Sequence, residues 1–114
     1  IMAKTNAAFM SGIPELLVLR LLSRSEMYGY ELIRAIRLTS GESIVLAEGV
    51  VYPTLHSLES KGLLKAKEKP VKGRVRVYYH TTAKGEKRLA EMEQEWHRIN
   101  NGVEAILRRE LCPS

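Results

Sequence analysis

Basic side chains gather in one quarter of this 114-residue sequence. Between residues 65 and 88, nine Lys and Arg residues stand against two Glu residues, a local net charge of +7, whereas the whole chain carries +5. Because Lys and Arg pair with phosphate oxygens, a positive segment of this kind is typical of a nucleic-acid contact surface. A run of charge is more often only a solvated face, so its meaning depends on the elements that carry it.

The segment that carries this charge is predicted to be a β-hairpin. Apolar and charged residues alternate from Leu63 to Lys69, Pro70–Gly73 has the composition of a loop, and the alternation returns over Val75–Tyr79. Flexible cations near the tip of such a hairpin can reach DNA phosphates or an adjacent minor groove. The cations expected at the tip are Lys69, Lys72, Arg74 and Arg76.

Helical patterns precede and follow the hairpin. Pro14 favours a helix start, apolar residues at i, i+4 and i+8 predict a second helix over Tyr28–Leu38, and a third is expected over about Glu48–Ser60. Thr82 is a suitable cap for a long fourth helix. This order predicts a winged helix-turn-helix, mainly α with a small β-hairpin wing. We expect a DNA-binding domain at 10–81 and a C-terminal dimerisation helix at 82–110.

The third helix is the expected recognition helix. With Val51, Leu55 and Leu58 turned inward, the outward face carries no Arg, Asn or Gln for bidentate base contacts. We therefore expect recognition through apolar contact, water and DNA shape. Pro53 is expected to tighten or kink the start of this helix. With the Tyr28 phenol aimed at a phosphate, the predicted DNA contacts outside the hairpin are Tyr28, Val50, Tyr52, Pro53, Thr54 and Ser57.

Apolar residues follow a heptad spacing of 3, 4, 3, 4 and 3 along the fourth helix. A stripe of this length exceeds what a small core can cover, and a second copy of the chain is the simplest partner. The expected dimer interface consists of Leu89, Met92, Trp96, Ile99, Val103 and Ile106. Asn100, Asn101 and Gly102 weaken helix propensity, so a bend or a close backbone approach is expected there.

Several motifs in this order resemble the PadR-like transcriptional regulators. They are Tyr28-Gly29-Tyr30-Glu31-Leu32, Glu48-Gly49-Val50-Val51-Tyr52-Pro53-Thr54-Leu55, Leu58-Glu59 with Gly62-Leu63-Leu64, Arg74 with Arg76-Val77-Tyr78-Tyr79, and Thr82-Ala83-Lys84-Gly85. The resemblance spans about residues 12–106. It implies a dimeric winged-helix DNA binder of the compact subgroup, usually a repressor and sometimes released by a small aromatic ligand. The sequence departs from the commoner pattern at Val50, where a small hydroxylated residue is frequent.

Trp96 extends the resemblance to effector binding. In drug-binding relatives, a tryptophan at this point of the long helix stacks on flat aromatic ligands. The resemblance therefore implies an effector pocket formed by Met10, Met92, Trp96 and Asn100. The alternative is that Trp96 only packs the dimer interface.

The sequence offers little for catalysis. His56, His80 and His97 are far apart and have no Cys, Asp or Glu at ligand spacing, and no phosphate loop, nucleophile elbow or zinc signature occurs. We expect neither enzyme activity nor a metal or cofactor. The sequence has a single cysteine, Cys112, and no long apolar stretch. Both features favour a cytoplasmic location. The alternatives are a winged-helix module that binds protein or RNA, and the dimerising fragment of a larger enzyme.

Overall fold

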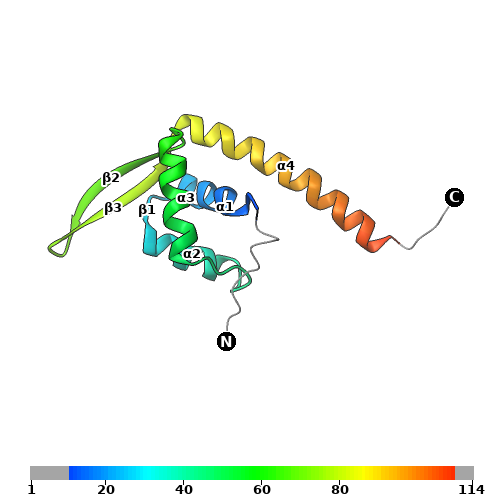
Figure 1. The fold of residues 1–114 in the computed structure, drawn as a ribbon, viewed down its shortest axis with the longest axis horizontal. Coiled ribbons are helices and arrows are strands. Elements are labelled where there is room, and N and C mark those ends of the chain that lie inside the picture. Colours follow the sequence, from blue (N-terminus) through cyan, green and yellow to red (C-terminus); the bar gives the residue numbers. More distant parts are fainter. Residues whose placement is uncertain (1–10, 110–114) are drawn as a thin grey trace.

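Four helices and a three-stranded sheet make up the part of the chain, residues 11–109, that the computed structural model describes (Figure 1). The fold class is confirmed as a mainly helical winged helix. None of the helices in this range is long and apolar enough to cross a membrane. In chain order the elements are α1 (Ile13–Arg24), β1 (Met27–Tyr28), α2 (Gly29–Thr39), α3 (Glu48–Ser60), β2 (Leu64–Val71), β3 (Arg74–Thr81) and α4 (Ala83–Arg108).

The hairpin β2–β3, called the wing below, is longer and tighter than predicted. The strands pair in register from Leu64↔Thr81 to Val71↔Arg74, which leaves only Lys72 and Gly73 in the turn. Both turn residues have positive φ, 51° and 78°, as a two-residue type I′ turn requires. Pro70 lies inside β2, where its missing N–H is tolerated because β2 is an edge strand.

A third strand, which the sequence did not lead us to expect, joins the sheet. The two-residue β1 pairs antiparallel with β3 through Met27↔Tyr79 and Tyr28↔Tyr78, giving the strand order β1-β3-β2. Two residues are too short to show any alternation of apolar and polar side chains. This pairing places the start of α2 beside the base of the wing.

The core lies where α1, α2 and α3 meet the inner face of the sheet. Apolar side chains at i, i+4 and i+7 on α3 (Val51, Leu55 and Leu58) are fully buried, as the periodicity predicted. Tyr79 is the buried member of its strand pair and Tyr78 is half-buried. The buried apolar set is Leu16, Val18, Leu19, Leu22, Leu32, Ile36, Leu46, Val51, Leu55, Leu58, Leu63, Leu64, Tyr79 and Leu89.

The start of α4 is fastened to the domain by a small network around Thr82. The Thr82 Oγ1 accepts a hydrogen bond from the Gly85 N–H (3.0 Å) and donates one to the Gly62 carbonyl (2.7 Å). A Cβ at Gly85 would overlap the Leu63 carbonyl oxygen. Glycine at this third helical position therefore allows α4 to begin directly against the chain that enters β2.

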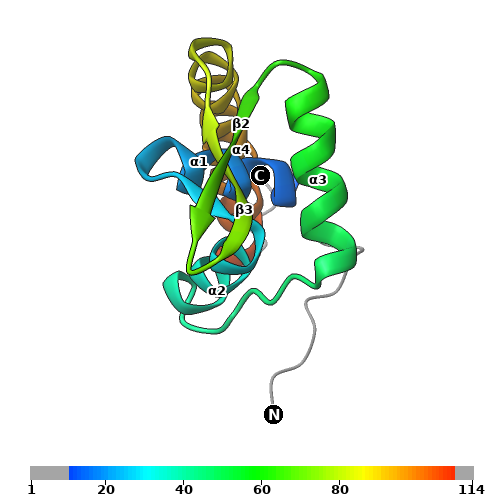
Figure 2. The ribbon, with the colours of Figure 1, turned by 90° about the vertical axis from the view of Figure 1, so that its left-hand side faces the viewer.

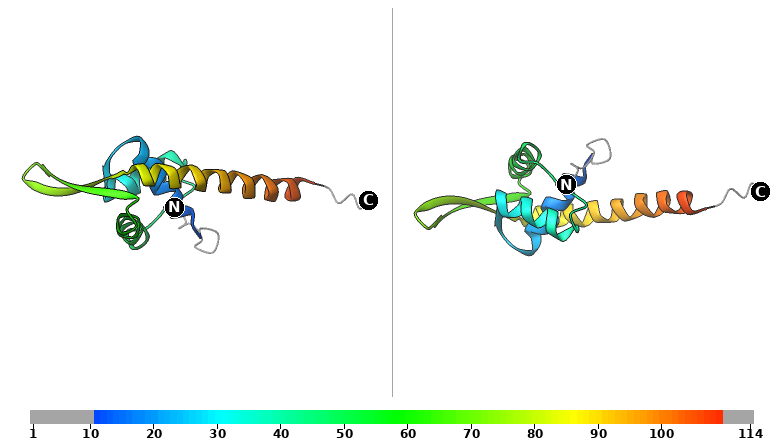
Figure 3. Two further views of the ribbon diagram at one scale, coloured as in Figure 1. Left: turned by 90° about the horizontal axis from the view of Figure 1, so that it is seen from above. Right: turned by 90° about the horizontal axis from the view of Figure 1, so that it is seen from below.

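The wing and α4 extend from opposite ends of the helical core. Views from above and below show the two projecting in opposite directions along the long axis (Figure 3). Seen from the wing end, α3 stands beside the hairpin (Figure 2). The molecule measures 67 × 37 × 20 Å, with most of that length due to these two projections (Figure 1).

Candidate nucleic-acid interface

The outward face of α3 carries the predicted recognition residues. Val50 is 40% exposed, Pro53 is exposed, and Thr54 and Ser57 are half-buried. The Thr54 Oγ1 donates to the Val50 carbonyl at 2.7 Å, so this hydroxyl keeps its lone pairs for an external donor. The helix runs from Glu48 to Ser60 without interruption despite Pro53. This face can therefore offer one apolar surface and two small hydroxyl groups.

Tyr52 points across from α3 to the start of α2. A Cβ at Gly29 would overlap the Tyr52 ring, so Gly29 is needed for this close approach. Tyr52 is half-buried and Gly29 is buried. The Tyr52 ring thus fixes the spacing of the two helices.

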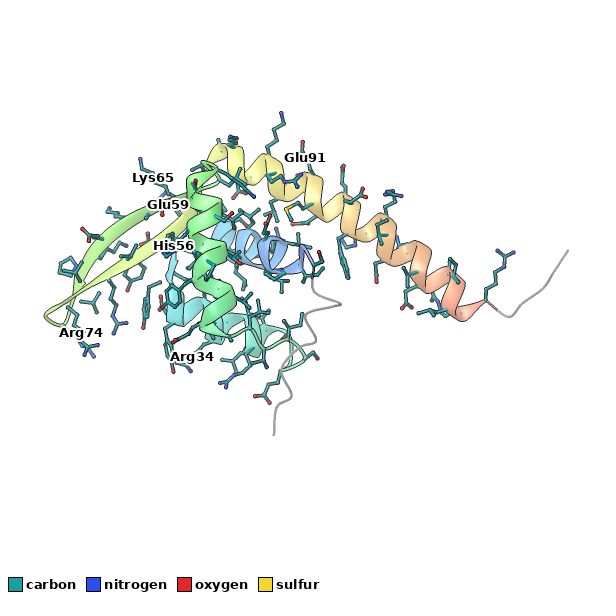
Figure 4. All side chains as sticks on the ribbon, viewed as in Figure 1. Arg34, His56, Glu59, Lys65, Arg74 and Glu91 are labelled. Atoms are coloured by element: carbon teal, nitrogen blue, oxygen red, sulfur yellow. The ribbon has the colours of Figure 1, made fainter. Side chains whose placement is uncertain are left out.

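Two of the four cations expected at the wing tip lie elsewhere. Lys72 and Arg74 occupy the turn and its first pair and are exposed, with Arg74 at the tip in Figure 4. Lys69 and Arg76 instead form the third pair from the turn and are half-buried. The expectation that they belong to the tip is wrong, because the strands continue past Pro70 to a two-residue turn.

An aromatic pair holds these two cations part-way along the wing. The rings of Tyr28 and Tyr78 meet edge to face, with centroids 5.4 Å apart and planes at 78°. The Arg76 guanidinium lies 4.3 Å from the Tyr28 centroid, and the Lys69 ammonium lies 4.9 Å from that of Tyr78. Lys69 also forms an ion pair with Glu26. Cation–π and ionic contacts therefore restrain side chains that would otherwise be flexible.

A cavity of about 320 Å³ opens between α3 and the wing, and we call it the helix–wing cavity. Arg76 is one of its lining residues, and the Nε of this side chain is shielded from solvent and has no hydrogen-bond partner within residues 11–109. Burial, followed by the nearby Glu59 carboxylate and Tyr52, raises the pKa of Tyr79. That phenol therefore stays neutral. The residues that line the cavity are Tyr28, Tyr52, His56, Arg76, Val77 and Tyr79.

His56 is a site residue that the sequence reasoning did not select. The sequence marks it only as a histidine far from the other two and without metal-ligand neighbours. The structure leaves it exposed on the side of α3 toward the wing, where it lines the helix–wing cavity (Figure 4). Only the tertiary arrangement of the wing beside α3 places it on the same cavity as Arg76, so spacing along the chain held no signal for it.

A second cavity, of about 370 Å³, lies between the start of α1 and the middle of α4. Met92 and Trp96 of the predicted effector pocket line it, together with Ile13, Leu16 and Ile99. Asn100 is not part of its lining, and Met10 lies outside the described residues. A flat apolar molecule in this cavity would contact the Trp96 and Met92 side chains.

The predicted dimer stripe divides into two parts. Leu89 is 3% exposed and Met92 packs against the core, so the structure contradicts Leu89 as part of an uncovered stripe. Trp96, Ile99 and Val103 are 41%, 46% and 48% exposed, and Ile106 is 76% exposed. The uncovered apolar surface therefore begins at Trp96.

The comparisons with known proteins agree with this architecture. Residues 18–91 match the family described as the transcriptional regulator PadR-like family. A solved PadR-like transcriptional regulator from Bacillus cereus is 31% identical, with a TM-score of 0.78, over 90% of this chain and 99% of that one.

Two further relatives are also regulators. The solved PadR family transcriptional regulator from Eggerthella lenta is 31% identical, with a TM-score of 0.78, covering 91% of this chain and 89% of that chain. The transcriptional regulator YqjI of Escherichia coli is 38% identical over 60 residues, which is 53% of this chain and 29% of that protein.

Proposed function

The chain belongs to the PadR-like family of transcriptional regulators, and on this premise we propose that it is a homodimeric, sequence-specific DNA-binding repressor. One observation carries the proposal. The exposed face of α3 lies beside a wing that bears six cations and one acidic residue, Glu68, between residues 64 and 81. A recognition helix flanked by a positive hairpin suits simultaneous contact with a major groove and the adjoining backbone.

In this proposal, residues 10–81 form the DNA-binding domain and residues 82–110 the dimerisation helix. Val50, Thr54 and Ser57 meet base edges, Val50 through a thymine methyl group. Tyr28, Tyr52 and Pro53 border this contact. The exposed Lys72 and Arg74 reach phosphates beyond the groove, and Lys69 and Arg76 act closer to α3.

Dimerisation follows from the apolar side chains that α4 leaves uncovered. Trp96, Ile99, Val103 and Ile106 continue one stripe beyond the domain's own core. Pairing with a second copy would remove this surface from water, at about 25 cal/mol per Å² of apolar area. A twofold dimer would then present two α3 helices to half-sites of a pseudo-palindrome about 34 Å apart.

Selection of bound duplexes from a random pool, followed by footprinting, tests the proposal. We expect enrichment of a two-part sequence that is protected by two protomers per duplex. Replacing Lys72 and Arg74 together by Gln should flatten the dependence of log K on log salt by about 0.9 for each phosphate that the variant no longer neutralises. Charge-conserving controls are Lys72→Arg and Arg74→Lys. Equal binding to all duplexes, a preference for RNA, or one protomer per duplex would contradict it.

We also propose that a planar aromatic effector occupies the cavity beside Trp96 and weakens DNA binding. The support is the apolar lining by Ile13, Met92 and Trp96 and its place at the root of the proposed dimer stripe. Trp96 fluorescence, titrated with a panel of planar aromatics, should change for at least one compound that also releases DNA. Fluorescence that no compound alters would leave Trp96 as an interface residue only.

A further inference from the structure

We propose that the helix–wing cavity binds one phosphodiester of the DNA backbone and clamps it between Arg76, Tyr52 and His56. The inference rests on the proposed function and adds a specific ligand group to it. The cavity joins three elements: β1 through Tyr28, α3 through Tyr52 and His56, and β3 through Arg76.

The Arg76 side chain is the first reason for a phosphate. Its Nε is shielded from solvent, yet no group in the described part of the chain accepts a hydrogen bond from it. The shielded Nε cannot itself meet an external group, but the Arg76 guanidinium forms no ion pair or side-chain hydrogen bond within residues 11–109, so its terminal N–H groups have no carboxylate partner there. The guanidinium carbon lies 4.3 Å from the Tyr28 ring centroid, and the terminal N–H groups of an arginine suit a phosphate acceptor.

The surrounding donors suit the same ligand. The Tyr52 phenol and the His56 imidazole each can donate a hydrogen bond, and both line the space that Arg76 enters. Tyr79, whose pKa is raised, keeps its proton. A phosphodiester has two unesterified oxygens that accept hydrogen bonds and one negative charge, which matches one arginine with hydrogen-bond donors around it.

The charges near the cavity do not oppose an anion strongly. No carboxylate is among its lining residues. Glu26 is paired with Lys69, and Glu31 accepts the Tyr28 N–H at 3.2 Å. Glu59, one turn after His56 on α3, is exposed and is the remaining acidic neighbour. Arg76 is thus the cation left without a carboxylate at this place.

A phosphate held here would also set the wing relative to α3. Arg76 belongs to the wing and Tyr52 and His56 belong to α3, so one bound anion would tie the two parts together. The wing-tip cations Lys72 and Arg74 are exposed and have no comparable arrangement. We therefore expect Arg76 to contribute more than its charge alone.

The first experiment compares Arg76→Lys with Arg74→Lys on the duplex obtained by selection. Both changes keep the charge, so general attraction to DNA is unaltered. Loss of the planar fork should weaken binding at least tenfold at Arg76 and less than about twofold at Arg74. Circular dichroism and thermal unfolding verify that both variants fold. Equal, small effects at the two positions would overturn the clamp.

The second experiment locates the phosphate. Single neutral methylphosphonates are placed at each backbone position of the same duplex. For the wild-type protein, one position in each half-site should show a penalty that His56→Ala and Arg76→Lys each abolish, while penalties at other positions remain. His56 is exposed, so His56→Ala should leave the fold intact. A penalty pattern identical in all three proteins would overturn the proposal.

A titration with inorganic phosphate in the absence of DNA, monitored by ³¹P NMR, distinguishes a site for the DNA backbone from a site for free phosphate. We expect millimolar or weaker binding. Micromolar binding that Arg76→Lys removes would identify a site for free phosphate instead and overturn the assignment to DNA. Failure to select any duplex would reject the proposed function, whereas selection with no Arg76 effect would reject the clamp alone.

Discussion

The two halves of α4 share one apolar spacing but have opposite surroundings. In the first half, Gly85 and Leu89 are buried against the chain's own domain, and Leu89 is 3% exposed. In the second half, Val103 and Ile106 occupy equivalent positions yet are 48% and 76% exposed. The same pattern therefore stabilises the fold at one end and leaves a surface for a partner at the other.

This difference teaches that heptad spacing alone does not say which chain covers a stripe. The position along the helix decides which chain covers the stripe, because contacts with the domain's own core end near Met92 while α4 continues. Changes in the first half should act on folding, and changes in the second half should act on association.

Charged substitutions in the second half of α4 should have the largest effect, and that effect should be on dimerisation. Ile99→Asp with Val103→Asp places carboxylates in the proposed dimer interface, where burial of an unpaired charge is costly. We expect the dissociation constant of the dimer to rise at least about a hundredfold while the monomer stays folded. Sedimentation velocity and circular dichroism measure the two properties.

The matched control adds the same charges outside the stripe. Gln94→Asp with Asn101→Asp changes two exposed residues, each two positions after a stripe residue. In a heptad these lie farthest from the facing helix. An equal loss of dimerisation in both double variants would refute the division of α4 proposed here.

Leu89→Ala should have the next largest effect, on folding. Removing a buried leucine leaves a cavity and costs about 2–5 kcal/mol in the free energy of unfolding. The measurement is urea unfolding in the Ile99→Asp, Val103→Asp background, so that association does not contribute. Ile106→Ala in that background should change the unfolding free energy by less than about 0.5 kcal/mol, since the side chain is exposed.

Replacing glycine by alanine should lower the free energy of unfolding in the first half of α4 and raise it in the second half. Gly85→Ala would force the new methyl group against the Leu63 carbonyl, so we expect a loss of about 1–3 kcal/mol in unfolding free energy. Gly102→Ala meets no atom within 4 Å, and higher helix propensity should stabilise the chain by up to about 1 kcal/mol. Urea unfolding in the same background compares them. Stabilisation by Gly85→Ala would show that α4 does not start against Leu63.

The smallest effect concerns a solvent-exposed pair in the second half. The hydrogen bond from Arg98, at 2.5 Å, and its charge lower the pKa of Glu95. Because the folded pKa is lowered, any stabilisation is present above the unfolded pKa and disappears as pH falls through the lowered value. Arg98→Gln should return the pKa of Glu95 toward its ordinary value, measured by NMR titration. Arg108→Gln, the control, should leave it unchanged.

Regular elements with a strong period were predictable from the residues. The bounds of α3 were predicted as Glu48–Ser60 and are observed so, because Val51, Leu55 and Leu58 mark one helical face and Lys61-Gly62 ends it. The wing was predicted as a hairpin, but its loop was predicted to begin at Pro70, two residues before the observed turn, because proline is typical of loops. Nothing in the sequence marked β1.

The candidate site was predictable only in part. The basic character of the wing and the outward face of α3 follow from local composition and periodicity. The helix–wing cavity does not, since His56 and Arg76 are twenty residues apart and line one cavity only because the wing lies beside α3 in the fold. Likewise, whether Lys69 was free or paired depended on Glu26, which lies far from it in the chain.

The sequence by itself determined which segments are helical, which are extended, where positive charge gathers and which face of each helix is apolar, because these depend on near neighbours along the chain. Only the tertiary structure decided that Leu89 belongs to the core and Trp96 does not, that Gly29 makes room for Tyr52, and that the Arg76 Nε has no hydrogen-bond partner among residues 11–109. Those outcomes depend on distances between elements, and such distances are set by packing over the whole domain.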